Sequence, residues 1–208
     1  MTGAAVRSRL LILRREREAA RRGQDLLEQK REVLLRELRQ RTRLRAEAEA
    51  RSAVALEQAR ARLREAQTEL GRLAVQSAAL AQTETVSVEP RVRKLLGIAL
   101  PSLKGRFQPF RPRYGTGGTA ESLDRAGTAF TDALPLLVQL AEEDLAVRNL
   151  QQGFARTVRR LNALEKVVLP RLDDEIRAVT TALEEEDRDE ALRRKRWLTA
   201  SRSRSQPL

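Results

Sequence analysis

The chain contains no cysteine and no histidine among its 208 residues. The absence of cysteine excludes disulfide bonds and thiolate metal sites, and the absence of histidine removes the side chain used most often in acid–base catalysis and metal binding. Aromatic residues make up only 3% of the sequence, so a compact core built around large rings is not expected. Composition alone therefore excludes most catalytic arrangements.

Long apolar runs are also absent. The N-terminal segment carries Arg7 and Arg9 and has no apolar stretch of the length that a signal sequence needs. No later segment approaches the length of a membrane span. We therefore expect a soluble, cytoplasmic protein without a signal peptide or transmembrane segment.

Charge of both signs is abundant. Charged residues make up 34% of the chain, and the formal net charge is +12. An excess of this size is compatible with nucleic acid, an anionic membrane surface or an acidic protein partner. The net charge does not choose among these three.

The first part of the chain, residues 1–82, has the pattern of one long helix. It contains no proline, and apolar pairs such as Ile12/Leu13 and Val33/Leu34 recur with a spacing of seven residues, which is typical of a coiled coil. The phase of this pattern changes near residues 42–50, where we expect the helix to bend.

The middle part, residues 83–119, is rich in helix breakers. It contains four prolines and a cluster of glycines, while Val86 and Val88 alternate with polar residues. These features predict a loop or short-strand region.

The helical pattern resumes at about residue 120 and continues to about residue 198. Proline disfavours a helix interior, so we expect a break near Pro135 and a kink at Pro170. The basic tail, residues 199–208, alternates Ser with Arg and has little apolar surface to bury, which predicts disorder.

The two predicted helices have matching lengths, each on the order of 115 Å at 1.5 Å per residue. An isolated helix of this kind cannot bury its apolar stripe. We therefore predict an all-α fold, a long antiparallel two-helix coiled-coil hairpin with the Pro/Gly-rich loop or a short β-hairpin at one end, forming one structural unit.

Short motifs do not indicate chemistry. The glycines of residues 115–119 match neither common phosphate-binding pattern and precede no lysine, so we interpret them as a turn. The acidic run at residues 184–187 is interpreted as a solvated helix face, and basic clusters are interleaved with acids. We predict no catalytic residue, no metal ligand and no cofactor.

A sharper interpretation comes from residues 160–172, with the sequence RLNALEKVVLPRL. This run resembles the signature of the D subunit of vacuolar/archaeal-type rotary ATPases, where an Arg, an Asn-Ala-Leu-Glu core and a Val-Val-Ile-Pro stretch follow in that order. Residues 11–38 are similar to the opening helix of that family, and residues 96–101 resemble its central loop. The likeness covers nearly the whole chain.

The resemblance implies a non-catalytic central rotor shaft that couples ATP synthesis or hydrolysis in a head of A and B subunits to ion translocation, by protons or sodium ions, through a membrane ring. It implies partners in the A and B subunits, in the F subunit, and in a socket subunit above the ring, with no direct nucleotide or nucleic acid. The complex would lie at the cytoplasmic face of the membrane as a peripheral sector. The end holding both termini is expected to enter the head, and residues 95–114 to meet the socket.

Five residues in the resembling segments are expected to contact partners: Lys30, Arg31, Arg160, Asn162 and Glu165. The alternative for each is that it supports only the helical hairpin. The alternative for the whole chain is a basic coiled coil that binds nucleic acid or an anionic membrane surface, and such binding weakens steeply as salt rises. An independent enzyme would need a convergent polar site, which the sequence does not contain.

Overall fold

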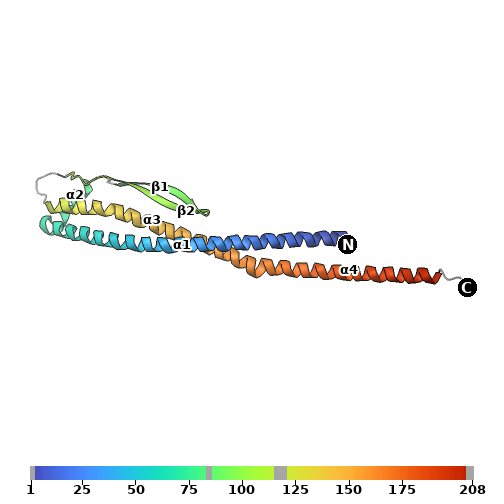
Figure 1. Cartoon of the computed structure of the whole chain (residues 1–208). Coiled ribbons are helices and arrows are strands. Elements are labelled where there is room, and N and C mark those ends of the chain that lie inside the picture. The colour runs from blue at the N-terminus through green and yellow to red at the C-terminus, as the bar shows by residue number, and fades with distance from the viewer. Residues whose placement is uncertain (1–2, 83–85, 115–120, 205–208) are drawn as a thin grey trace. The chain divides into compact units, whose positions relative to one another are not determined.

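A computed structural model describes residues 3–82, 86–114 and 121–204, and side chains within residues 6–82, 86–114 and 121–197 (Figure 1). The elements follow in the order α1 (Gly3–Leu70), α2 (Arg72–Leu80), β1 (Val86–Leu95), β2 (Ile98–Phe107), α3 (Glu121–Ala163), the π-helix η1 (Leu164–Val168) and α4 (Leu169–Arg204). The fold contains two compact units. Unit 1 joins Met1–Arg31 to Arg156–Leu208, and unit 2 comprises Glu32–Ala155.

In unit 1, the start of α1 pairs with the segment that contains η1 and α4. Arg9 forms an ion pair with Glu175, and Arg17 forms one with Asp173. Farther along α1, Gly23 lies next to Leu164. The partner number falls as the α1 number rises, so the two helical segments are antiparallel.

In unit 2, the rest of α1 pairs antiparallel with α3. Leu34 belongs to one buried cluster with Leu150, and Ala66 belongs to another with Leu123. Small side chains line much of this seam and let the helices approach closely; the buried alanines of unit 2 include Ala48, Ala59, Ala66, Ala126, Ala133 and Ala146. The predicted all-α fold of paired antiparallel helices with a short β-hairpin is confirmed.

The first helix ends earlier than predicted. Gly71 has a φ of 80°, a left-handed conformation that glycine adopts without steric cost, and it separates α1 from the short helix α2. The sequence predicts one helix to residue 82 because a lone glycine in a helical pattern does not reveal its φ angle.

The two strands form an antiparallel ribbon closed by Leu96 and Gly97. These two residues have φ angles of 48° and 80°, as a two-residue type I′ turn requires. Along each strand, every second residue points its backbone N–H and C=O away from the other strand. Counting from the turn places Pro90 and Pro101 at such positions. Neither proline therefore interrupts the bonds between the strands.

The outer edge of β2 lies against α3. The backbone N–H of Leu103 donates to Glu142 Oε2 at 2.7 Å, and Asn149 Nδ2 donates to the carbonyl oxygen of Ala99 at 2.9 Å. Two side chains of α3 thus satisfy backbone groups that would otherwise remain unpaired on the edge of the ribbon.

The ribbon folds back along the helices of unit 2. Ile98 and Leu100 are buried with Leu34 and Leu150, so the turn lies beside Leu34. At a rise of about 1.5 Å per residue, Leu34 is roughly 54 Å along α1 from its end at Leu70. The expectation that residues 95–114 lie together at the end of the helix pair is therefore wrong for the turn.

The predicted break near Pro135 does not occur, because α3 continues through this residue. Ala126 and Ala133 are buried before it and Ala146 after it, and packing of this kind offsets the bond that proline removes. At the other end, α4 extends to Arg204, beyond the predicted helix end. Residues 199–204 of the predicted disordered tail are thus helical, and residues 205–208 lie outside the described residues.

None of the helices in the described part of the chain is both long and apolar enough to cross a bilayer.

Candidate functional site

All five residues expected to contact partners lie in unit 1. Lys30 and Arg31 are on α1, Arg160 and Asn162 are near the end of α3, and Glu165 is in η1. The fold therefore brings both resembling segments into the same compact unit, although about 130 residues separate them in the sequence.

Burial separates these residues into two groups. Lys30 and Arg31 are half-buried, whereas Arg160, Asn162 and Glu165 are exposed. Within the described part of the chain, no ion pair or side-chain hydrogen bond involves any of the five. The three exposed side chains thus contribute no polar contact to the helix pairing and are available to another molecule.

Their orientation is determined by a neighbour. Leu161, between Arg160 and Asn162, is 3% exposed and belongs to the buried seam. A buried residue in a helix directs the residues on either side of it away from that seam. Leu161 thus anchors the segment and leaves the polar side chains at the surface.

The segment that follows is a π-helix. The N–H of Leu169 donates to the carbonyl of Leu164, one residue farther back than in an α-helix. Pro170 follows directly, and in a regular α-helix its ring would clash with the carbonyl of Lys166. The wider turn accommodates the proline, so the distortion that the sequence predicts at Pro170 takes the form of a π-helix.

The π-helix presents apolar side chains to solvent. None of its five residues is buried, and Val167 and Val168 are 61% and 37% exposed. Together with Glu165 and Lys166 they form a mixed surface, and short π-helices occur often at functional sites. Val168 follows the buried Leu161 by seven residues, a spacing that predicts a buried position, so its exposure was not expected; the one available signal was Pro170.

Ion pairs across unit 1 are exposed or, at Arg17 and Asp173, half-buried. Arg7 to Asp187 measures 3.1 Å, Arg9 to Glu175 3.3 Å, and Arg17 to Asp173 2.7 Å. Exposed pairs of this kind contribute about 0–1 kcal/mol each. The apolar seam therefore holds this unit together more than its charges do.

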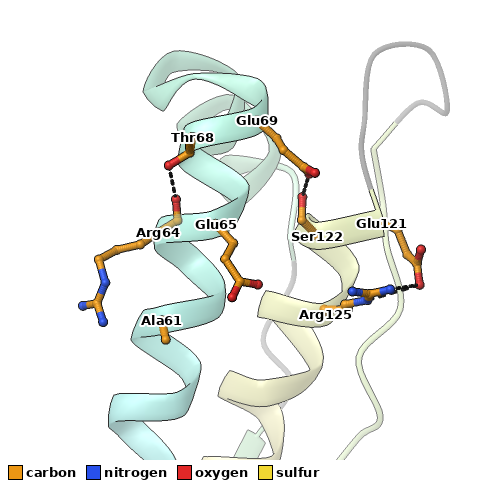
Figure 2. Close-up of a pocket in the computed structure, with 8 residues that line it drawn as sticks. All are labelled: Ala61, Arg64, Glu65, Thr68, Glu69, Glu121, Ser122 and Arg125. Atoms are coloured by element: carbon orange, nitrogen blue, oxygen red, sulfur yellow. Dashed lines mark hydrogen bonds and ion pairs between the residues drawn. The ribbon is translucent and has the colours of Figure 1, made fainter.

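Unit 2 contains a polar cleft of about 790 Å³ between α1 and α3 (Figure 2). Its lining combines basic and acidic side chains, so the two signs of charge lie close together. Ser122 donates to Glu69, and Arg125 donates to Glu121 at 2.7 Å, a hydrogen bond that raises the pKa of Arg125. No cluster of acidic residues in the described residues could hold a metal ion. We assign no catalytic role to this cleft.

An apolar cleft of about 270 Å³ lies at the same end of unit 2. Phe110 and Tyr114 contribute to its wall, and the Tyr114 hydroxyl donates to Asp124. Burial and this hydrogen bond both raise the pKa of Tyr114. These contacts tie the segment after β2 to the start of α3.

A charged network that the sequence does not reveal lies between α1 and α3 in unit 2. Arg41 Nη1 is 2.9 Å and 3.1 Å from the two carboxylate oxygens of Glu143, and its Nε is 3.0 Å from Glu37. Burial by itself would lower the pKa of Arg41, but the hydrogen bonds to Glu37 and Glu143 outweigh it and raise the pKa. Only the Glu37–Arg41 spacing is visible in the sequence.

The similarity to known proteins covers both resembling segments. A family model that describes the D subunit of ATP synthase matches residues 9–198. The A-type ATP synthase D subunit of Methanopyrus kandleri is 31% identical over 192 residues, covering 91% of this chain and 83% of that protein. The V-type ATP synthase D subunit of Thermotoga neapolitana is 30% identical over 197 residues, covering 94% and 97%. All five expected contact residues lie within the matched range.

Proposed function

Because the chain belongs to the D-subunit family of ATP synthases, we propose that it is the central rotor shaft of a V/A-type rotary ATPase. The family match over residues 9–198 carries this proposal, and the antiparallel helix pair found in each unit supports it. In this role, the chain transmits rotation between ATP synthesis or hydrolysis in the head and ion movement through the membrane ring.

The chain makes no bonds itself in this proposal. Alternating A and B subunits hold the nucleotides, and a shaft without threefold symmetry presents a different face to each A/B interface. Each rotational position then favours a different conformation of each site, because a ligand or partner shifts an equilibrium only through its differential contacts with the two states. The chain acts as a non-catalytic subunit.

The partners we propose are the A and B subunits, the F subunit and a socket subunit above the ring, with the complex at the cytoplasmic face of the membrane. Arg160, Asn162 and Glu165 are the most accessible of the expected contact residues, since all three are exposed and lack partners among the described residues. Val167 and Val168 add apolar surface next to them. Polar and apolar groups together suit a protein interface.

The test is a pull-down of the tagged chain from its own cells at moderate and high salt, with retained proteins identified by mass spectrometry. Recovery of the A, B and F subunits at both salt concentrations is the expected result. Recovery of nucleic acid or lipid instead, lost at high salt, would favour the alternative of a basic coiled coil.

A matched pair of variants tests the contact residues. Replacing Arg160, Asn162 and Glu165 by Ala together is expected to reduce recovery of the partners at high salt. Replacing Arg39, Gln40 and Glu47, which are also exposed but lie on α1 in unit 2 and outside the resembling segments, serves as the control and should leave recovery unchanged. Equal recovery with both variants would assign the first three residues no role in binding.

A further inference from the structure

The ribbon and the segment after it carry an unusual charge. Residues 86–114 contain one acidic residue, Glu89, and seven basic residues, all exposed: Arg91, Arg93, Lys94, Lys104, Arg106, Arg111 and Arg113. We call these seven residues the basic hairpin surface. The helical residues of unit 2, 32–82 and 121–155, have twelve basic and thirteen acidic residues. The positive excess of unit 2 is therefore concentrated on this surface.

Most of these charges form no ion pair with the residues that the structure describes. Among the described residues, only Arg106 of the seven forms an ion pair, with Glu89 at 3.3 Å. On the helices of unit 2, by comparison, six of the twelve arginines form an ion pair among the described residues, Arg41, Arg45 and Arg60 among them. Repulsion among like charges costs free energy that an anionic partner would relieve.

The strand register places four of the bases on one face. Arg91 and Arg93 lie opposite Ser102 and Leu100, while Lys104 and Arg106 lie opposite Glu89 and Ser87. Directly opposed and alternate residues share a face, so these four side chains form a strip on the order of 20 Å long. Leu100, which lies opposite Arg93 on this face, is buried, and the other three bases lie farther from the turn.

We infer that the basic hairpin surface docks an acidic segment of a partner protein. This inference rests on the proposed function, because the partner would be another subunit of the complex. A strip of separated cations matches an extended run of carboxylates, and complementary charge of this kind increases the association rate and the specificity of the contact.

A flat anionic bilayer fits less well. Glu142 of α3 lies directly against β2 through the Leu103 N–H and is half-buried there. A membrane surface wide enough to cover the strip would also approach this carboxylate of the neighbouring helix. A narrow protein segment avoids Glu142, and the one carboxylate on the strip, Glu89, is paired with Arg106.

Nucleic acid also fits less well, because single-stranded chains bind proteins through stacking on exposed aromatic rings. The ring of Phe110 packs against Gly127, and the hydroxyl of Tyr114 donates to Asp124. Two of the three aromatic residues in this segment are thus engaged within the chain.

The first experiment measures binding of a polyglutamate peptide to the full chain at low salt. The test variant replaces Arg91, Arg93 and Lys104 by Gln, and the matched control replaces Arg60, Arg62 and Arg64 on α1. From typical exposed charge contacts, the test variant is expected to bind about tenfold more weakly and the control within about twofold of the unchanged chain. Equal weakening by both variants would overturn the inference, since it would show an effect of net charge only.

Vesicles with and without anionic lipid, and single-stranded DNA, are tested with the same three proteins. Stronger loss of vesicle or DNA binding than of polyglutamate binding would overturn the choice of a protein partner. A test variant that self-associates on size-exclusion chromatography yet binds polyglutamate normally would show that the bases only protect the strand edge.

The second experiment uses the assembled complex. A photo-crosslinking residue at position 104 is expected to label a peptide rich in Asp and Glu on another subunit, and labelling of a peptide without acidic residues contradicts the inference. If position 104 labels a peptide without acidic residues while the A, B and F subunits are recovered normally, this inference is rejected and the proposed function stands. Failure of the unchanged chain to recover those subunits would reject the proposed function instead, while polyglutamate binding still tests the surface.

Discussion

A β-carbon added to Gly153 would fall 2.1 Å from Cδ1 and 2.7 Å from Cγ1 of Ile98. Gly153 lies on α3, and Ile98 is the first residue of β2, directly after the turn. The absence of a side chain at Gly153 thus lets the ribbon seat against the helices, in the buried cluster around Leu34 and Leu150.

Replacing Gly153 by Ala should therefore destabilise unit 2. Ile98 is enclosed by its cluster and cannot move aside freely, so we expect overpacking to cost about 1–3 kcal/mol, partly offset by the higher helix propensity of Ala. Urea denaturation followed by circular dichroism measures the effect. Gly23→Ala is the matched control: its β-carbon would lie 3.9 Å from Leu164, and we expect stabilisation of about 0.5–1 kcal/mol. The same sign for both variants would contradict the packing argument.

The turn offers a second prediction. Leu96 has a left-handed φ of 48°, a conformation that costs a residue with a side chain about 1–2 kcal/mol. The Leu96 side chain is 45% exposed, so its burial contributes little free energy to offset that cost. Leu96→Asn should stabilise the hairpin by roughly 1 kcal/mol because Asn-Gly is the preferred type I′ pair. Gly97→Ala should destabilise it, since φ is 80° at that position. Denaturation midpoints that move in the opposite directions would exclude this turn geometry.

The third prediction concerns the charged network between α1 and α3. Glu143 is 7% exposed and accepts two hydrogen bonds from Arg41, so Glu143→Ala leaves the guanidinium with Glu37 alone. We expect a loss of about 1–3 kcal/mol in the free energy of unfolding, below the range for fully buried pairs because Arg41 is partly exposed. A double-mutant cycle with Arg41→Met isolates the pair. A coupling energy near zero would show that the two side chains act independently.

Tyr114 gives a pH-dependent prediction. Burial and the bond to Asp124 raise its pKa above the ordinary value of about 10, so the protonated form is favoured in the folded state. This stabilisation is fully present below about pH 10 and is lost as pH rises through the folded-state pKa. Tyr114 is the only tyrosine, so the absorbance of tyrosinate reports it directly. Asp124→Asn should move the midpoint down, and an unchanged midpoint would mean that burial alone is responsible.

Pro170→Ala tests the π-helix. The substitution restores a backbone donor and removes a residue that costs about 3 kcal/mol in a helix interior, so the melting temperature should rise. Assembly with the A, B and F subunits should be preserved. Loss of the complex with a stable chain would show that the distortion itself is needed for binding.

Much of the fold follows from local patterns in the sequence. Seven-residue apolar spacing predicts the long helices, and the prolines together with alternating Val86 and Val88 predict the short strands. These signals depend only on neighbours in the chain. Gly71 and Pro135 show the limit of that approach: a glycine's φ angle and a proline's tolerance in a helix depend on packing from distant residues.

Contacts between distant segments were not predictable from one sequence. No local pattern indicates that Ile98 seats against Gly153 or that Arg41 reaches Glu143. For the candidate site, resemblance identifies the segments, but it cannot rank residues within them. The structure makes that distinction through burial, since Arg160 is exposed and Lys30 is half-buried.

The π-helix η1 also acts as a shift of phase. One extra residue in a helical turn rotates every later side chain by about 100° around the axis. Val168, seven residues after the buried Leu161, is accordingly turned outward, and burial resumes with the half-buried Leu169 and reaches Leu183. A single-residue insertion is the simplest event that produces this arrangement, and a deletion within residues 164–168 would undo it. Such a deletion would leave Leu169 seven positions after Leu161, so the apolar stripe of α4 would stay in register with the seam and only the wide turn would be lost.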